Sequence, residues 1–419
     1  MWSQSIGKAG AQRRLFTARF GSSLSAWSRQ PPKRSRGIST RPDLASTNKA
    51  RLILGIETSC DDSCASIVSS DRTILSSIVT KQDHSSTGGI HPLSAALGHH
   101  ANLPATIATA IEQARIAASE LDAIAVTQGP GMASCLGVGL SAAKTLSAVL
   151  RKPLIYVHHM QAHALTPLLT ETHPPTFPFL VLLVSGGHTM LVLARSVTEF
   201  RILATTKDDS IGDAFDKVAR DLGIPWTSAP GAALEALAAR SATEGEDIVF
   251  PIPCKGQPLF SYSGLKAAAQ RHIDSRGGSG MAETEKASIA AAFQRAACAQ
   301  LEDKLSMLLR PSHLTQDSRH RPYPRIHLDS KGGAGGGGDE IKTLVCSGGV
   351  ASNSFLRRRL REHLDGLGRA DVDLQFPPLS LCTDNAAMIA WVGHLIYDQR
   401  TQDYSRHARP KWSMEDIQR

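Results

Sequence analysis

After residue 51 the chain alternates short hydrophobic runs with polar turns and with longer segments of helical periodicity. This pattern predicts strands at 51–57, 64–70, 123–128 and 153–158, and helices at about 101–118 and 134–150. The succession of strand, helix and strand between 123 and 158 predicts a β-α-β unit whose second strand ends in two histidines. Ligand sites of α/β folds lie at such carboxyl ends of strands.

The pattern begins again at residue 178, where strand, glycine-containing turn and strand occupy 178–194, as they do at 52–68. Two openings of the same kind predict a duplicated α/β unit. The later pattern predicts helices at about 211–222, 231–241 and 284–309, a strand-loop-helix at 343–364 and a last long helix that begins near Thr383. Residues 310–340 are rich in Gly, Pro and charge, so we expect a low-complexity surface insertion there.

The basic charge of the chain is concentrated at its start. The 419 residues include 46 Lys or Arg and 38 Asp or Glu, a formal net charge of +8. Residues 1–49 hold ten of the basic residues and one acid, which leaves 36 basic and 37 acidic residues, or −1, for the rest. An Arg- and Ser-rich, acid-poor segment with the amphipathic stretch RRLFTARF is typical of a mitochondrial transit peptide. We expect it to be disordered and cleaved before Arg51; a basic arm that binds nucleic acid is the alternative.

The remaining composition sets broad limits. A chain with 42% hydrophobic and 20% charged residues is ordinary for a globular protein. Its hydrophobic runs are shorter than the roughly 20 residues that span a bilayer, so no membrane insertion is expected. Seven scattered cysteines fit a reducing compartment without a disulfide framework. Cys60 and Cys64 are interpreted as small structural residues, because two thiols without a second pair are weak evidence for zinc.

The stretch VHHMQAH at 157–163 is a candidate metal site. If the segment from His159 onward is helical, His159 and His163 share a face and can hold one ion, while the preceding histidine points elsewhere. For an isolated pair, histidines that merely hydrogen-bond the backbone are the alternative. A carboxylate is the expected third ligand. Asp384 in CTDNAAMIA offers one, although Thr383 or Asp384 could instead cap the following helix.

Three glycine-containing turns at strand ends are candidate phosphate sites: GIETS at 55–59, LVSGGH at 183–188 and CSGGVASN at 346–353. Successive backbone N–H groups at such turns form concavities that attract phosphate. Glycines more often only tighten hairpins, but two such turns in a duplicated fold and a third that opens a helix favour a nucleotide site. Asp216 in GDAFDKVAR is either an exposed helix acid, which the spacing favours, or an acceptor for a ribose hydroxyl.

Eight ordered motifs, GIETSCDD, GPGMASCLGVG, VHHMQAH, LVSGGH, AFDK, FSYSGLK, GGVASN and CTDNAAM, resemble the tRNA N6-adenosine threonylcarbamoyltransferase family, once catalogued as glycoproteases. The match runs from about residue 52 to 412 and omits only the leader and the 310–340 insertion. With the leader, the chain resembles the mitochondrial branch. The resemblance implies an actin-like α/β fold of two ribonuclease-H-like subdomains, with the active site in the cleft between them. The implied subdomains are 51–177, completed by 392–419, and 178–391.

The resemblance also implies a reaction. The threonylcarbamoyl group of threonylcarbamoyl-adenylate would pass to N6 of the adenosine 3′ to the anticodon, position 37 of mitochondrial tRNAs that read ANN codons, with release of AMP. One divalent metal ion per subunit, zinc or iron, would be held by His159, His163 and Asp384. The adenylate would contact Leu183, Val184, Ser185, Gly186 and Gly187, with Asp216, Gly231 and Asn353 at its adenosine end. A homodimer in the mitochondrial matrix is expected, and no covalent nucleophile, because the mixed anhydride is already activated.

The chain departs from the family pattern at three places. Gln161 and Ala162 replace the usual Glu-Gly between the histidines, and Asp213 replaces a Glu before Ala-Phe-Asp. APGA at 229–232 replaces Pro-Gly-Gly-Pro, which makes Gly231 the least secure of the implied contacts.

Three other functions compete with group transfer. An ATP-dependent phosphotransferase or ATPase on the same scaffold would also use phosphate-binding turns, but magnesium in such sites prefers carboxylates and water to histidine. A zinc peptidase of the H-E-x-x-H kind needs a glutamate where Met160 stands. The third alternative is a non-catalytic nucleotide-binding scaffold that recruits tRNA.

Any tRNA footprint must be a local patch, because the chain after residue 49 is near neutral. The candidates are the C-terminal stretch SRHARPKW and the group Arg357, Arg358, Arg359 and Arg361, for which a solvated helix face is the alternative reading.

Overall fold

The computed structural model describes residues 49–84, 89–225, 229–243, 248–309 and 341–418. Almost all of the predicted leader and the whole of the predicted insertion lie outside the described residues. Their predicted structure therefore stays a prediction.

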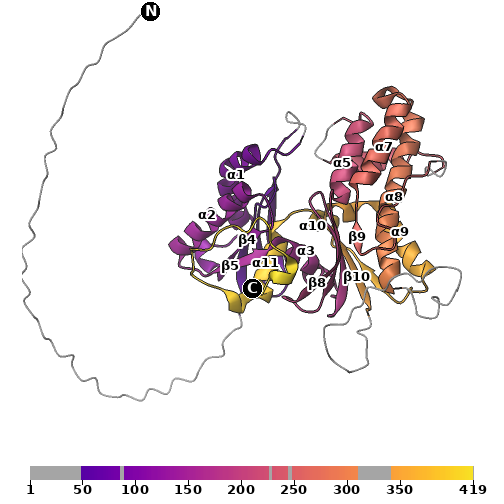
Figure 1. Cartoon of the computed structure of the whole chain (residues 1–419). Helices are drawn as coiled ribbons and strands as arrows, with labels where there is room; N and C mark the ends of the chain where they lie inside the picture. Colours follow the sequence, from indigo (N-terminus) through magenta and orange to yellow (C-terminus); the bar gives the residue numbers. More distant parts are fainter. Residues whose placement is uncertain (1–48, 85–88, 226–228, 244–247, 310–340, 419) are drawn as a thin grey trace, which may run out of the picture. The chain divides into compact units, whose positions relative to one another are not determined.

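The first sheet has five strands in the order β3-β2-β1-β4-β5. Its strands are β1 (Leu52–Glu57), β2 (Ser63–Ser69), β3 (Ile74–Thr80), β4 (Ala123–Gly129) and β5 (Leu154–His158). β1, β2 and β3 form an antiparallel meander, and β4 and β5 run parallel to β1. α1 (Pro92–Gln113) packs on β2 and β3, and α2 (Ala133–Leu150) packs on β4, which completes the predicted β-α-β unit (Figure 1).

The second sheet has the order β11-β10-β6-β7-β8-β9. Its strands are β6 (Phe179–Val184), β7 (Thr189–Ala194), β8 (Phe200–Thr206), β9 (Leu259–Phe260), β10 (Thr343–Ser347) and β11 (Asp373–Gln375). β6, β7 and β8 again form an antiparallel meander, and β10 and β11 again run parallel to the first strand, β6. The short β9 adds a further strand beside β8. The strand order of the first sheet is thus repeated, and the predicted duplication is confirmed. The helices that follow are α5 (Ile211–Asp221), α6 (Pro230–Ala238), α7 (Ser263–Ser275), α8 (Glu283–Leu309) and α9 (Ser354–Gly366).

The strand β6 is apolar along its whole length because both of its faces are buried. Leu180, Leu182 and Val184 pack with α5, α7 and α8 in one core. The alternate residues join a second core with the first sheet, α3 (His159–Leu165) and α11 (Ala386–Leu395). Both α3 and α11 are therefore buried almost all round. The short helices α4 (Pro167–Thr170) and α10 (Leu379–Cys382) follow α3 and precede α11.

The helix α11 lies backbone to backbone against β1. A Cβ atom on Gly55 would lie 2.1 Å from the carbonyl oxygen of Ala386 and 2.8 Å from the nitrogen of Ala390. Because α11 packs on β1, β2 and β4, it belongs to the first sheet from its first residue. The expected boundary between the two subdomains, between residues 391 and 392, falls inside α11. The start of α11 at Ala386 fits this packing better as the boundary.

The helix α2 is the one helix among the described residues that is long and apolar enough to cross a membrane, judged by length and composition alone. Its inner side, which includes Leu136, Leu140 and Ala143, is buried. This face packs against β4 and α1, as a core helix of an α/β domain does.

Several boundaries differ from the predictions. α1 begins at Pro92, not near residue 101, with a proline in its first turn and Pro104 inside it. The last helix begins at Ala386, not near Thr383, and has ten residues. The predictions did not include β3, β8 or α7.

Candidate metal centre

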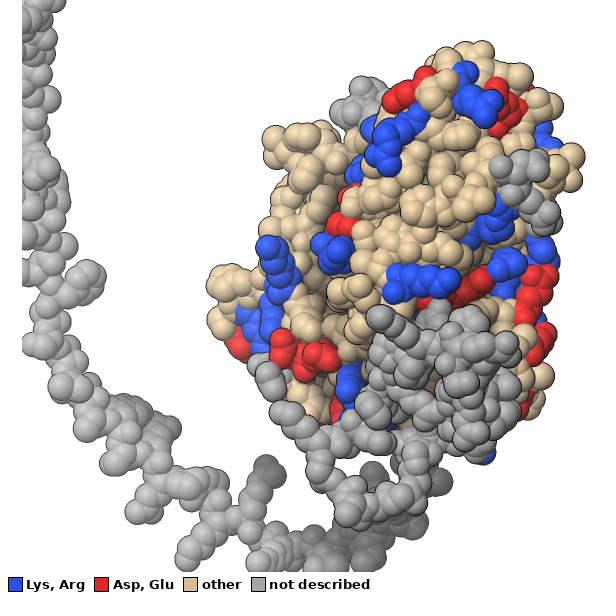
Figure 2. All heavy atoms as spheres, turned by 45° about the vertical axis from the view of Figure 1, so that its right-hand side comes forward, with Lys and Arg blue, Asp and Glu red and all other residues tan. Residues whose placement is uncertain are grey.

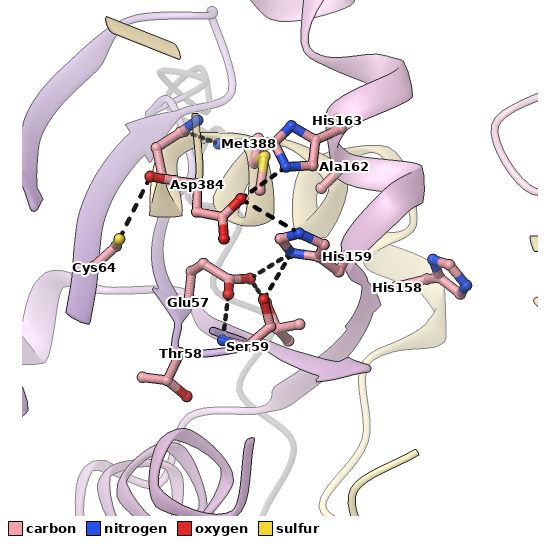
Figure 3. Close-up of polar contacts among 12 residues, drawn as sticks. Glu57, Thr58, Ser59, Cys64, His158, His159, Ala162, His163, Asp384 and Met388 are labelled. Carbon is pink, nitrogen blue, oxygen red and sulfur yellow. Dashed lines mark hydrogen bonds and ion pairs between the residues drawn. The ribbon is translucent and has the colours of Figure 1, made fainter. Parts of the chain in front are cut away.

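The strand β5 runs directly into α3, and this junction separates the three histidines. The Nδ1 atom of His158 accepts a hydrogen bond from the backbone N–H of Gln161, so His158 caps the helix. Its Nε2 atom donates to the carbonyl of Trp412, 3.0 Å away, and the ring lies against the Trp412 indole. Figure 3 shows its side chain pointing away from the other two. His158 thus points away from the other two, as expected, and is held by helix α3 and Trp412.

His159 and His163 stand one helical turn apart on α3 and face the same side. Their ring centroids are 4.8 Å apart, at an interplanar angle of 87°. Both residues are buried, because α3 lies in the core that joins the two sheets. The backbone of a fully buried helix holds both rings in place, so the pair is positioned before any ligand binds.

Asp384 reaches the two rings from the turn between α10 and α11. Its Oδ1 atom lies 3.1 Å from His163 Nε2 and 3.5 Å from His159 Nε2 (Figure 3). Neither Thr383 nor Asp384 caps α11, contrary to that alternative. The cap is Asn385, whose side-chain oxygen accepts from the N–H of Met388. The carboxylate of Asp384 is therefore directed to the histidines.

The opposite side of His159 is held by Glu57, the last residue of β1. The Nδ1–H of His159 donates to Glu57 Oε2 at 3.0 Å, and the hydroxyl of Ser59 lies 3.2 Å from the same nitrogen. Glu57 also accepts from the Ser59 N–H and the Thr127 hydroxyl, and it has no exposed surface. A carboxylate on Nδ1 keeps that nitrogen protonated and turns Nε2 toward Asp384. Sequence reasoning missed Glu57, although a charge at the end of an apolar strand was a signal.

The carboxylates and His159 perturb one another. Burial alone would raise the pKa of Asp384, but the charge and hydrogen bonds of His159 and those of His163 hold it well below its usual range. Burial would lower the pKa of His159, but Glu57 and Asp384 raise it well above its usual value. Burial raises the pKa of Asp62 to about 7, with further contributions from Asp61 and Asp384. This concentration of acid around two imidazoles favours a bound cation.

His159, His163 and Asp384 fit a divalent metal ion. One ligand atom from each lies within 4.8 Å of the other two. Asp384 Oδ1 already lies 3.1 and 3.5 Å from the two Nε2 atoms, so small side-chain shifts would let all three hold one ion. Two imidazole nitrogens and one carboxylate oxygen suit zinc or iron better than magnesium.

The turn after β6 presents open backbone next to this cluster. Ser185 Oγ accepts from the N–H groups of Gly187, at 3.3 Å, and His188, at 3.0 Å. Nothing lies within 4 Å of a Cβ atom placed on Gly186 or Gly187, so the turn has room for a ligand. Leu183 and Val184 are fully buried strand residues, so only their backbone can contact a ligand.

His188 follows this turn and lies near enough to His159 and His163 to feel their charge; it is the second residue that sequence reasoning did not single out. Burial lowers its pKa to about 4, and the nearby His159 and His163 contribute. The ring is therefore neutral near pH 7, able to accept or donate a hydrogen bond without adding charge.

Asp216 and Gly231 meet between α5 and α6. The N–H of Gly231 donates to Asp216 Oδ1 at 2.9 Å. Burial raises the pKa of Asp216 to about 6, partly offset by this hydrogen bond. Asp216 is therefore not the exposed helix acid that its spacing favoured.

Asn353 lies in the turn between β10 and α9. Its side-chain oxygen caps α9 by accepting from Leu356 N–H, and its nitrogen donates to Gln294 at 2.9 Å. The preceding Gly348 touches the end of β6, where a Cβ atom would lie 2.3 Å from the carbonyl oxygen of Val184. The third glycine-containing turn thus adjoins the second.

The four arginines of α9 are engaged within the protein. Arg359 forms two hydrogen bonds of 2.8 Å with Glu302, and Arg357 stacks on Phe376. Arg358 and Arg361 pair with acids one turn away. Figure 2, turned toward this side of the molecule, shows acidic and basic residues side by side. The solvated-face interpretation of these arginines is favoured over a tRNA patch.

Comparisons with known proteins agree with the motifs. The profile of the tRNA N6-adenosine threonylcarbamoyltransferase family matches residues 73–391. A protein of that name from Erythrobacter litoralis is 38% identical over 370 residues, 87% of this chain and 96% of its own. A protein of Arabidopsis thaliana named probable tRNA N6-adenosine threonylcarbamoyltransferase, mitochondrial, is 36% identical over 386 residues, 87% of this chain and 75% of its own.

A solved structure, HypF of T. kodakarensis, superposes with a TM-score of 0.50 at 12% identity, over 83% of this chain and 48% of that one. This likeness concerns the fold alone, and the predicted actin-like fold is confirmed. With its motifs, its fold and its relatives in agreement, the chain belongs to the tRNA N6-adenosine threonylcarbamoyltransferase family.

Proposed function

We propose that this chain transfers the threonylcarbamoyl group from threonylcarbamoyl-adenylate to N6 of adenosine 37 in tRNA and releases AMP. The convergence of His159, His163 and Asp384 beside an open glycine turn carries the proposal. The amine of adenosine attacks the carbamoyl carbon, the bond to the phosphate oxygen breaks, and the amine loses a proton. Because AMP is a good leaving group, the protein needs no covalent nucleophile and works by positioning and charge stabilisation.

The residues divide this work between them. The open turn at Gly186 and Gly187 would receive the adenylate through backbone N–H groups. Asp216 would accept from a ribose hydroxyl in place of, or beside, the N–H of Gly231. Asn353 would keep the turn before α9 in place.

A divalent ion on His159, His163 and Asp384, zinc or iron, would supply a net positive charge that binds phosphate or threonyl oxygens. Glu57 keeps the Nδ1 atom of His159 protonated, so Nε2 stays available as a ligand atom.

The leader bears on the compartment in which the protein acts. We propose that residues 1–49 direct the chain to the mitochondrial matrix and that its substrates are mitochondrial tRNAs that read ANN codons. The excess of nine positive charges in this segment supports import. Fused to a fluorescent protein, the segment should carry it to mitochondria, whereas a fusion with its arginines replaced by alanine should stay in the cytosol.

We also propose a homodimer. Leu93 and Leu97 stand one turn apart on α1, and 63% and 62% of their surface is exposed. Exposed apolar side chains that adjoin on one surface are candidates for association, and these two adjoin on α1. Light scattering should give the mass of two chains, and the Leu93→Asp/Leu97→Asp variant should give the mass of one.

Purified protein with threonylcarbamoyl-adenylate and tRNA should yield modified nucleoside, detected by mass spectrometry. Asp384→Ala should lose at least about 100-fold in rate, because it removes the only carboxylate among the three ligands. Equal product from both would refute the metal site. If the protein binds tRNA and adenylate but forms no product under any metal condition, the non-catalytic scaffold replaces the transferase.

A further inference from the structure

The C-terminal residues 401–412, here called the strap, follow the first sheet in an extended path without helix (Figure 1, yellow). Thr401 exchanges two backbone hydrogen bonds of 2.8 Å with Leu154 of β5. The Tyr156 hydroxyl donates to the carbonyl of Asp403 at 2.7 Å. The side chain of Gln128 donates to the carbonyl of His407 at 2.9 Å. The strap is thus held to the protein over most of its length.

The end of the strap reaches His158, the sequence neighbour of the proposed ligand His159. Arg409 N–H donates to the carbonyl of Gln128, and Gly131 N–H donates to the carbonyl of Pro410. A Cβ atom on Gly129 would lie only 1.9 Å from the carbonyl oxygen of Arg409, so the strap passes here because glycine leaves room. Trp412 then binds His158, the neighbour of the metal ligand His159.

The strap carries cations that its own packing holds in place. Arg406 lies over the ring of Tyr156 at 5.1 Å, and Arg409 lies over Trp412 at 4.1 Å. Asp403 is its one acid, and it pairs with Arg406 at 3.5 Å. Among the described residues, no carboxylate lies within 4.0 Å of Arg409 or Lys411. This contrasts with the arginines of α9, three of which pair with acids.

Exposed aromatic surface accompanies the charge. Tyr404 has 39% of its surface exposed, and Lys411 is also exposed. A surface that carries both cations and aromatic rings suits single-stranded RNA, because Lys or Arg side chains bind the phosphates and the rings stack on unpaired bases.

We infer that the strap binds the anticodon loop of tRNA, with Arg409 and Lys411 contacting the phosphates that flank the target adenosine. The inference rests on the proposed function, since it concerns how that substrate reaches the metal site. It places a positive track along β5 that ends beside His158, so a loop bound there presents its bases toward His159.

The test measures binding of an anticodon stem-loop RNA to the full chain by fluorescence anisotropy over a range of salt concentrations, and separately the KM for tRNA and for the adenylate. Arg409→Ala/Lys411→Ala should weaken RNA binding about tenfold at low salt. Each lost phosphate contact should also flatten the slope of log K against log salt by about 0.7. KM should rise for tRNA and stay unchanged for the adenylate.

Arg271→Ala/Arg276→Ala, near the C-terminal end of α7 and at its C-cap, is the matched control, since both arginines are exposed and the charge change is equal. It should bind RNA as the unaltered chain does. Lys411→Glu is a second variant, chosen because no hydrogen bond or ring contact of the Lys411 side chain is found among the described residues. It should weaken RNA binding without lowering the melting temperature.

The outcomes separate the two proposals. If the unaltered chain modifies tRNA but both strap variants bind RNA with its affinity and salt slope, the strap inference is overturned and the proposed function stands. An equal loss in the α7 control would also overturn it, because the effect would then be general charge. If the unaltered chain neither binds nor modifies tRNA, the proposed function itself fails.

Discussion

At the scale of single residues, the site depends on side chains that no ligand needs to touch. Glu57 ends a strand whose other residues are apolar, and its hydrogen-bond partners, His159, Ser59 and Thr127, lie inside the protein. Burying a carboxylate costs free energy unless hydrogen bonds compensate for the lost water. The arrangement is understandable if the carboxylate orients His159 for a ligand on the other ring nitrogen.

Replacing Glu57 should therefore weaken metal binding. Glu57→Ala is expected to lower the affinity for zinc about 10- to 100-fold, since outer carboxylates of metal-binding histidines have effects of this size. Glu57→Gln, whose amide oxygen can still accept, should lose less. Metal competition with a chromogenic chelator measures the affinity, and NMR of the imidazole nitrogens reports the tautomer. The exposed Glu120→Gln is the control; unchanged affinity in Glu57→Ala would contradict the role.

Replacing Asp216 should raise the stability of the protein and weaken adenylate binding. The Asp216 pKa of about 6 in the folded chain exceeds the ordinary 3.8, so the folded state binds more protons between these values. The free energy of unfolding therefore falls as pH rises through this window. Asp216→Asn should unfold with up to about 3 kcal/mol more free energy than the unaltered chain above pH 6, and with no gain below pH 4. Urea titrations at several pH values test this, and adenylate binding should weaken in the same variant.

At the scale of elements, the predictions succeeded where pattern and burial agree. The strands β1, β4, β5 and β6 are continuous apolar runs, and the helices α5 and α8 were placed within a residue or two. β3 was missed because it lies at an edge, with only one of its residues buried, so its apolar pattern is weak. α7 was missed because its few buried positions are spread among polar residues.

For the site, too, residues marked by local sequence pattern were found and residues defined by tertiary contacts were not. His159, His163 and Asp384 could be named because helical spacing and motif resemblance pointed to them. Glu57 and His188 were missed: the charge at the end of an apolar strand marks Glu57 as unusual, but its partner His159 lies 102 residues away, and His188 comes near α3 only in the folded chain. Asp216 was misjudged because the position of α6, which buries it, is set by tertiary packing.

The cap of α11 links an element boundary to the metal site. Asn385 caps the helix and also donates to the carbonyls of Leu381 and Thr383, which fixes the backbone on both sides of Asp384. Asn385→Ala should lower the free energy of unfolding by about 1 kcal/mol and also weaken metal binding. Ser413→Ala removes the cap of the short 3-10 helix Met414–Asp416. It should lower the free energy of unfolding without changing metal affinity. Chemical denaturation and metal titration of both variants distinguish the two effects.

At the scale of the whole molecule, the proposed metal ligands lie where both sheets share a core. His159 and His163 lie on α3, and Asp384 precedes α11; both helices pack in that core. An ion that binds only the folded chain stabilises it by about 2.7 kcal/mol at a concentration one hundred times its Kd. Zinc should therefore raise the melting temperature, chelators should reverse the rise, and Asp384→Asn should abolish it. A rise of the same size in Asp384→Asn would place the ion elsewhere.

The contact between Gly55 and α11 has a consequence for how this sequence can vary. Even one methyl group at position 55 would collide with the first turn of α11, and the helix would have to move away from β1. Asp384 precedes that turn, so the movement would draw its carboxylate off the two imidazoles. If the proposed site is the catalytic one, selection for catalysis extends to a strand residue that is not itself a ligand, and an apparently mild change there would inactivate the enzyme while leaving all three proposed ligands in the sequence.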